Sequence, residues 1–206
     1  QVTGKWIYLS SNRYQRVPTT VWPFFVDNFE GGIVWRLEKD DFSTTCQRAD
    51  ITTQFNFNAN SYGVALTDQT SDTGSTIYWA VHGGGNNSLD IRRATDNSNS
   101  ITLFTRAISA FPASNRGNMV CTAPDGTDPC ARFNSRIATG WLSKGQVGFM
   151  WHAGQSAAAG WPFPHTRVAI FQTSDMSLVE EPHIWNSNYA WVMPTAGVNN
   201  RGDIAG

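Results

Sequence analysis

The side chains of this protein that are best suited to acid–base chemistry or ligand binding belong to four histidines. His82 and His152 each end an aromatic-rich run (IYWAVH and GFMWH) and precede a glycine-containing turn, while His165 and His183 follow further along. Strand ends lead into surface connections, where binding residues often gather. A histidine at such a position can equally bond to the backbone alone. No HExxH or similar ligand spacing occurs, so we expect no catalytic zinc.

We predict a ligand site in the connections around the run Val147–Trp151, which is itself expected to be core. These connections hold an imidazole, an amide and an indole within a few residues, and the segment Trp161–His165 reads WPFPH. Arg116, Arg132, Arg136 and Arg167 would bind a carboxylate if the fold brought them together. The predicted ligand-binding residues are His82, Arg136, His152, Gln155, Trp161 and His165.

Carboxylates could bind a metal ion or act as an acid/base pair. Asp125 and Asp128 lie in one short loop and could bind Ca²⁺ through oxygen ligands, although the loop lacks the length and ligand number of a known calcium motif. Glu180 and Glu181 are adjacent in an extended run, so they face opposite sides and cannot form an acid/base pair with each other. There is no GxSxG nucleophile motif and no phosphate-binding glycine loop. The sequence therefore predicts no cofactor other than Ca²⁺ at Asp125 and Asp128.

Three cysteines bear on the cellular compartment. Cys121 and Cys130 bracket the loop CTAPDGTDPC, which predicts a disulfide ring that contributes roughly 2–3 kcal/mol by restricting the unfolded chain. Cys46 is left over, either as a buried thiol or as half of a pair whose partner lies elsewhere. A disulfide together with a weakly charged surface predicts a secreted protein. In a eukaryotic secretory pathway Asn86, in the sequence Asn86-Asn87-Ser88, would accept an N-linked glycan.

Composition excludes several classes of partner. Charged residues make up only 15% of the 206 residues, the formal net charge is −1, and no basic cluster exceeds Arg92-Arg93. Nucleic-acid binding through phosphate neutralisation is not expected. No apolar run approaches the roughly 20 residues of a spanning helix, so we expect no membrane insertion. Nine tryptophans are spread along the chain, most of them expected in sheet cores and some available on loops to stack on sugars.

The elements that must position these residues read as short strands separated by turn clusters, with no clean helical period. The chain is therefore predicted to be all-β and a single domain. The strands fall into groups of four, the clearest being a meander within Ser135–Trp185. The predicted strands are Trp6–Leu9, followed by a polar linker through Thr20, then Trp22–Val26 and Ile33–Leu37 with a turn at Asp27–Gly32, then Gln54–Asn58, Tyr62–Thr67, Ile77–His82, Leu89–Ala94, Ile101–Ala107, Arg136–Leu142, Gln146–Ala153, Thr166–Gln172 and Ser177–Trp185.

One stretch resembles a known motif. Thr70-Ser71-Asp72-Thr73-Gly74-Ser75-Thr76-Ile77 is similar to the Asp-box of sialidase-like β-propellers, with Ile77 in place of the usual aromatic residue. The resemblance implies a propeller of four-stranded blades, in which the box is structural and distant from the active face. A β-sandwich is the alternative architecture. The strands make about three blades, and Trp191–Gly206 resembles the opening of another, so we expect a longer protein or closure with other copies.

Three functions follow as hypotheses. The first is a secreted module that binds glycan or another extracellular ligand. The second is a glycoside hydrolase or lyase on the same scaffold, using a carboxylate pair. The third is a structural or assembly protein without catalytic activity, in which exposed edge strands pair between copies.

Overall fold

The computed structural model describes residues 1–22, 25–40, 54–58, 63–69, 74–113 and 119–206. Strands make up 51% of the chain and helices 5%, so the predicted all-β class is confirmed. The helical turns are 3-10 helices, η1 (Pro129–Arg132) and η2 (Ala157–Ala159). The strands are β1 (Trp6–Pro18), β2 (Phe25–Glu38), β3 (Gln54–Asn58), β4 (Ala65–Gln69), β5 (Thr76–His82), β6 (Ser88–Thr95), β7 (Ile101–Ala107), β8 (Ile137–Ser143), β9 (Gln146–Ala153), β10 (His165–Gln172), β11 (Leu178–Glu180), β12 (His183–Ile184), β13 (Gly197–Val198) and β14 (Ile204–Ala205).

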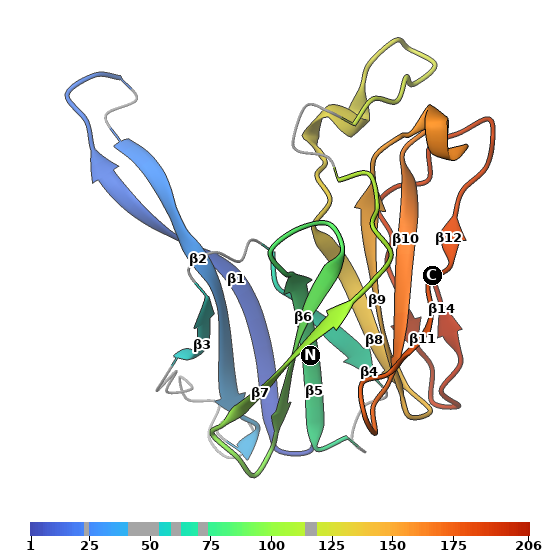
Figure 1. Cartoon of the computed structure of the whole chain (residues 1–206). Coiled ribbons are helices and arrows are strands. Elements are labelled where there is room, and N and C mark those ends of the chain that lie inside the picture. Colours follow the sequence, from blue (N-terminus) through green and yellow to red (C-terminus); the bar gives the residue numbers. More distant parts are fainter. Residues whose placement is uncertain (23–24, 41–53, 59–62, 70–73, 114–118) are drawn as a thin grey trace.

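The largest sheet joins two groups of consecutive antiparallel strands. Its order is β11-β10-β9-β8-β4-β5-β6-β7, and β12 pairs beside β11 on the same edge of β10. The joint is the parallel pair β4–β8, where Thr67 lies opposite Gly140 and Gln69 opposite Leu142. The resulting sheet is barrel-like and nearly closed (Figure 1).

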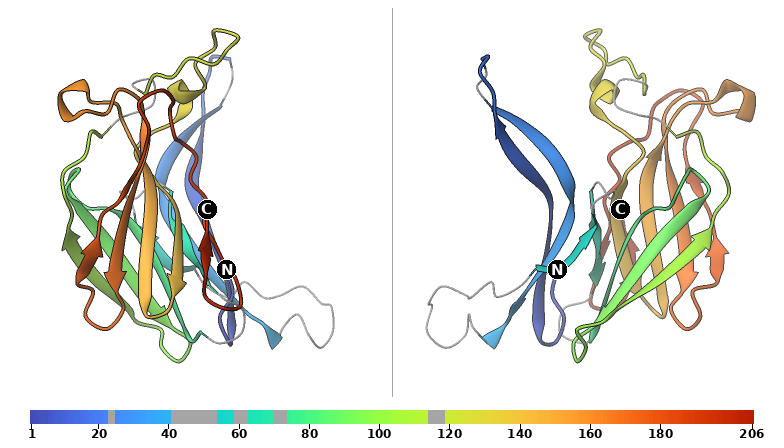
Figure 2. Two further views of the ribbon diagram at one scale, coloured as in Figure 1. Left: turned by 90° about the vertical axis from the view of Figure 1, so that its right-hand side faces the viewer. Right: turned by 60° about the vertical axis from the view of Figure 1, so that its left-hand side comes forward.

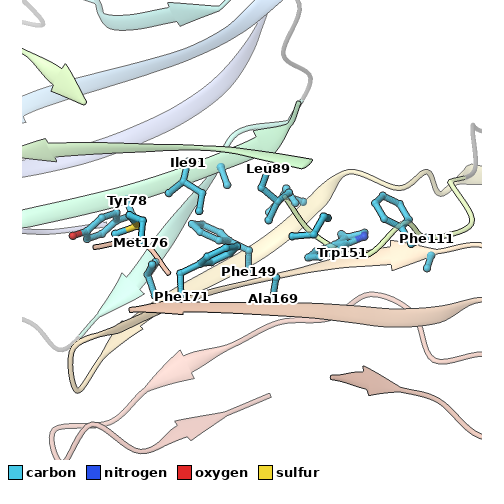
Figure 3. Close-up of a cluster of buried hydrophobic side chains, with 14 residues drawn as sticks. Tyr78, Leu89, Ile91, Phe111, Phe149, Trp151, Ala169, Phe171 and Met176 are labelled. Atoms are coloured by element: carbon cyan, nitrogen blue, oxygen red, sulfur yellow. The ribbon is translucent and has the colours of Figure 1, made fainter. Parts of the chain in front are cut away.

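The two groups of strands share the larger hydrophobic core, and smaller buried clusters form around Trp79 and around Trp141. Tyr78, Leu89 and Ile91 from β5 and β6 face Phe149 and Trp151 from β9, all of them buried (Figure 3). Phe171 and Ala169 from β10 complete the layer. The meander predicted within Ser135–Trp185 is present, but the propeller is not confirmed, because the two groups pair edge to edge in a continuous ladder. Residues 70–73 of the Asp-box lie outside the described residues.

The predicted end of the meander is wrong in one respect. The single run Ser177–Trp185 is two short strands, β11 and β12, both paired with β10. Pro182 lies between them and has no N–H to give to a ladder, which interrupts the strand.

β1, β2 and β3 form a separate three-stranded sheet, in which β1 and β2 make a long ribbon that extends away from the large sheet (Figures 1 and 2). β1 and β2 pair without a break from Trp6–Glu38 to Pro18–Phe25, with a bulge at Arg13/Tyr14. The predicted linker through Thr20 and the predicted turn at Asp27–Gly32 are therefore wrong, because Gly31 and Gly32 lie inside the ladder. Of the described residues, none belongs to a helix long and apolar enough to cross a bilayer.

Candidate ligand-binding site

The connection between β9 and β10 is a small closed loop that fixes the position of Trp161. Ser156 and Trp161 exchange two backbone hydrogen bonds of 2.7 and 2.9 Å, which enclose η2. Gly160 ends η2 in the left-handed conformation, with φ of 82°, which a residue with a Cβ adopts only at a cost. Trp161 is thereby held at the entrance to β10, beside the prolines of the WPFPH segment.

The Trp161 indole covers a pair of imidazoles. His165 Nε2 and His183 Nδ1 are 3.1 Å apart and share a hydrogen bond. The two rings are nearly coplanar, at an interplanar angle of 19° with centroids 5.2 Å apart, so they meet edge to edge. The indole lies 4.5 Å from the His183 ring and 4.8 Å from the His165 ring, measured between centroids. Predicted site residues Trp161 and His165 are thus brought together, with His183 as a third member.

Both imidazoles of this pair are neutral at neutral pH. Burial, together with the nearby Arg167 and His165, lowers the pKa of His183 to about 4, against a smaller opposing effect of Glu181. Burial is also the main cause of the lowered pKa of His165. Because the lone pair of one ring faces the N–H of the other, these two nitrogens do not converge on a point where a metal ion would sit.

A buried ion pair lies next to these two histidines, between Arg167 on β10 and Glu181 in the connection between β11 and β12. The Arg167 side chain is 1% exposed, and its Nη2 lies 3.1 Å from Glu181 Oε1. The Glu181 carboxylate also accepts hydrogen bonds from the Ser109 N–H and hydroxyl. Arg167 is therefore not open to a ligand. The expected convergence of arginines is not found, since Arg136 lies against Gly63 and Arg132 is exposed in η1, while Arg116 is outside the described residues.

A pocket of about 280 Å³ opens beside this connection. It lies between the disulfide loop and the segment that follows β12. Asn186 Oδ1 accepts hydrogen bonds from the backbone N–H of Asn188 and of Tyr189, at 2.8 and 2.7 Å, and this turn leaves the Tyr189 side chain 70% exposed. The lining residues are Cys121, Thr122, Ala123, Pro129, Phe163, Asn188, Tyr189, Ala190 and Val192.

The far side of the pocket is held by the predicted disulfide, which is present between Cys121 and Cys130. Asp128 Oδ1 accepts hydrogen bonds from the N–H groups of both cysteines, and Asp125 Oδ1 accepts two from Thr127. These bonds to Thr127 lower the pKa of Asp125. Both carboxylates thus brace the loop. In the described part of the chain, Cys121, Asp128 and Cys130 form the one group with metal-ligand spacing, and its sulfurs are already bonded to each other. Calcium at Asp125 and Asp128 stays a prediction.

The other predicted site residues lie apart from the pocket lining. His152 donates from Nδ1 to the Asn134 carbonyl, and its Nε2 accepts from the Met193 N–H at 2.8 Å, so both ring nitrogens serve the backbone. His82 packs between Phe111 and Trp151. Gln155 immediately precedes the closed loop that begins at Ser156. The side-chain amide of the exposed Asn86 donates a hydrogen bond of 2.6 Å to the Phe111 carbonyl. Cys46 lies outside the described residues.

Sequence reasoning missed Asn188 and Tyr189. The signal was present as Asn186-Ser187-Asn188-Tyr189, a cluster of turn residues that directs an aromatic side chain into solvent. Comparisons with protein-family models, with curated proteins and with solved structures found no match for this chain.

Proposed function

We propose that this protein is a secreted β-protein that binds glycan in the pocket between the disulfide loop and the segment 186–192. The observation that carries the proposal is Tyr189, a 70% exposed aromatic ring at the rim of a pocket that also contains Phe163 and the Asn188 amide. Exposed aromatic rings offer a flat apolar face for the C–H groups of a sugar, and an amide can bond to its hydroxyls. The pocket volume is close to that of small-ligand sites.

Binding is favoured over hydrolysis by the absence of carboxylates from the lining. Glycoside hydrolysis needs two carboxyl groups across the scissile bond, and no Asp or Glu is among the described residues that line this pocket. Glu181, a mostly buried carboxylate in the connection between β11 and β12, is engaged by Arg167 and Ser109. Secretion is supported by the disulfide, which persists in oxidising compartments.

We also propose that the two four-stranded groups are blades of a β-propeller. β4–β7 and β8–β11 are each four consecutive antiparallel strands, which is the unit of a propeller blade. An experimental structure with a third four-stranded unit rotated about the same axis would support blades. A hydrogen-bonded ladder between β7 and β11 would exclude them in favour of a closed barrel.

Tyr189→Ala tests the proposed function. We expect at least a tenfold loss of affinity for a glycan identified on a glycan array, because removal of the ring deletes the stacking face. Trp22→Ala is the matched control, since Trp22 is 79% exposed but lies in the connection between β1 and β2, beyond the last pair of the ribbon, Pro18–Phe25. Equal affinity of Tyr189→Ala and the unchanged protein, measured by isothermal titration calorimetry, would refute the proposed site.

A further inference from the structure

The pocket beside Tyr189 has an uncharged lining. None of its described lining side chains is charged at neutral pH: they are aromatic, aliphatic, hydroxyl, amide or disulfide groups. The site therefore offers no guanidinium or ammonium group to pair with a ligand carboxylate. Burying an unpaired anion in such a place is unfavourable, because water would be lost without a compensating charge.

A negative charge lies directly beside the lining. The Asp128 carboxylate accepts a hydrogen bond of 3.1 Å from the backbone N–H of Cys121, which is itself a lining residue. Asp125 lies in the same loop, and its lowered pKa keeps it ionised at neutral pH. The nearest described cation along this loop is Arg132, which lies in η1 outside the lining. An anionic ligand would meet repulsion from both carboxylates and no opposite charge in the wall.

We infer that the pocket selects uncharged saccharides and rejects acidic ones such as uronates and sialic acids. The inference rests on the proposed glycan-binding function and names its ligand class. It departs from what the sialidase-like resemblance implies, because that family's chemistry needs arginines around a ligand carboxylate. Here the described Arg167, the most deeply buried arginine near the site, already has its carboxylate in Glu181.

The test compares matched glycans that differ in charge. An array would carry galactan beside galacturonan oligomers, and neutral lactosamine oligomers beside their sialylated forms. We expect the uncharged member of each pair to bind at least fivefold more tightly. Equal or tighter binding of the acidic members would overturn the inference while leaving glycan binding intact. Binding to none of the glycans would overturn the proposed function, and the inference with it.

Replacing the loop carboxylates by amides tests whether their charge, and not the shape of the pocket, causes the discrimination against acidic glycans. Asp125→Asn keeps the acceptor for Thr127 and removes the charge, so it should reduce the discrimination against acidic glycans two- to threefold, as should Asp128→Asn. Asp175→Asn is the control, because Asp175 makes the same turn, accepting from the Ser177 N–H and hydroxyl, but lies between β10 and β11. An unchanged ratio in both Asp125→Asn and Asp128→Asn would overturn the electrostatic basis of the inference.

Discussion

Burial of His82 makes the free energy of unfolding of this protein depend on pH. Burial against Phe111 and Trp151 lowers its pKa to about 4, whereas an unfolded chain would keep it near 6.5. Between pH 6.5 and 4 the unfolded chain therefore binds more protons than the folded one, so the free energy of unfolding decreases as the pH falls through this window. For one histidine the full effect is at most about 3 kcal/mol.

His82→Leu should remove this residue's share of the pH dependence. Urea unfolding monitored by tryptophan fluorescence at pH 7.5, 6.5, 5.5 and 4.5 would measure it, since most carboxylates titrate below that range. The unchanged protein is expected to lose stability steadily below pH 6.5, and His82→Leu to lose less. Parallel pH profiles for the two proteins would contradict the assignment. The pKa values of His152, His165 and His183 are lowered as well, so these residues contribute to the remaining slope.

At this scale the sequence identified Trp161 and His165 as neighbours but could not pair His165 with His183. The two histidines are 18 residues apart, and only the antiparallel register of β10 and β12, which places Arg167 opposite His183, brings their rings together. For His152, the possibility of simple backbone bonding was the correct description of its contacts.

Among the elements, β8 and β9 depend on glycines that face aromatic rings. Trp141 lies opposite Gly148 and Phe149 opposite Gly140 in the antiparallel ladder. The buried Trp141 ring occupies the space where a Cβ on Gly148 would be. Gly148→Ala should therefore destabilise the protein by about 1–3 kcal/mol through overpacking, measured as a lower urea midpoint.

Gly84→Ala is the matched control for this substitution. A Cβ on Gly84 would meet nothing within 4 Å, so the same chemical change should leave the free energy of unfolding unchanged or slightly raised. A Gly148→Ala protein as stable as Gly84→Ala would show that the Trp141 ring can move aside without cost.

Strand positions followed from the alternation of apolar and polar residues, and the bounds of β3, β7 and β9 agree with those predicted. The β1–β2 ribbon was not predictable in the same way. Its outer half is polar and exposed, and the Gly31-Gly32 pair has the composition of a turn. The long ladder between the two strands supplies backbone hydrogen bonds through this region that no local pattern indicates.

Over the whole molecule, the arrangement of the sheet depends on contacts between distant segments. The parallel joint of β4 and β8 links residues about seventy positions apart. A grouping of strands in fours along the sequence does not specify which strand edges will meet. At the opposite side, the described strands β7 and β11 share no ladder. Side chains connect them instead: Arg106 donates to the Met176 and Asp175 carbonyls, and Ser109 donates to Glu181.

Glu181 is the centre of this second closure, because it joins the segment after β7 to buried Arg167 on β10. Glu181→Ala would leave the Arg167 guanidinium buried without its counter-charge and the Ser109 N–H without its acceptor. Loss of one partner of a buried pair typically costs about 3–5 kcal/mol. We expect a loss of this size in urea unfolding, together with faster hydrogen exchange in β7 and β10, since the two sides of the sheet would separate more readily.

Glu180→Ala is the control for this last prediction. Glu180 is adjacent in sequence, equally charged and exposed, so its removal should change the free energy of unfolding by no more than about 0.5 kcal/mol. If Glu181→Ala were as mild as Glu180→Ala, the ion pair would not hold the sheet closed. The packing of Phe149, Trp151 and Phe171 against β5 and β6 would then be the interaction that keeps the two groups of strands together.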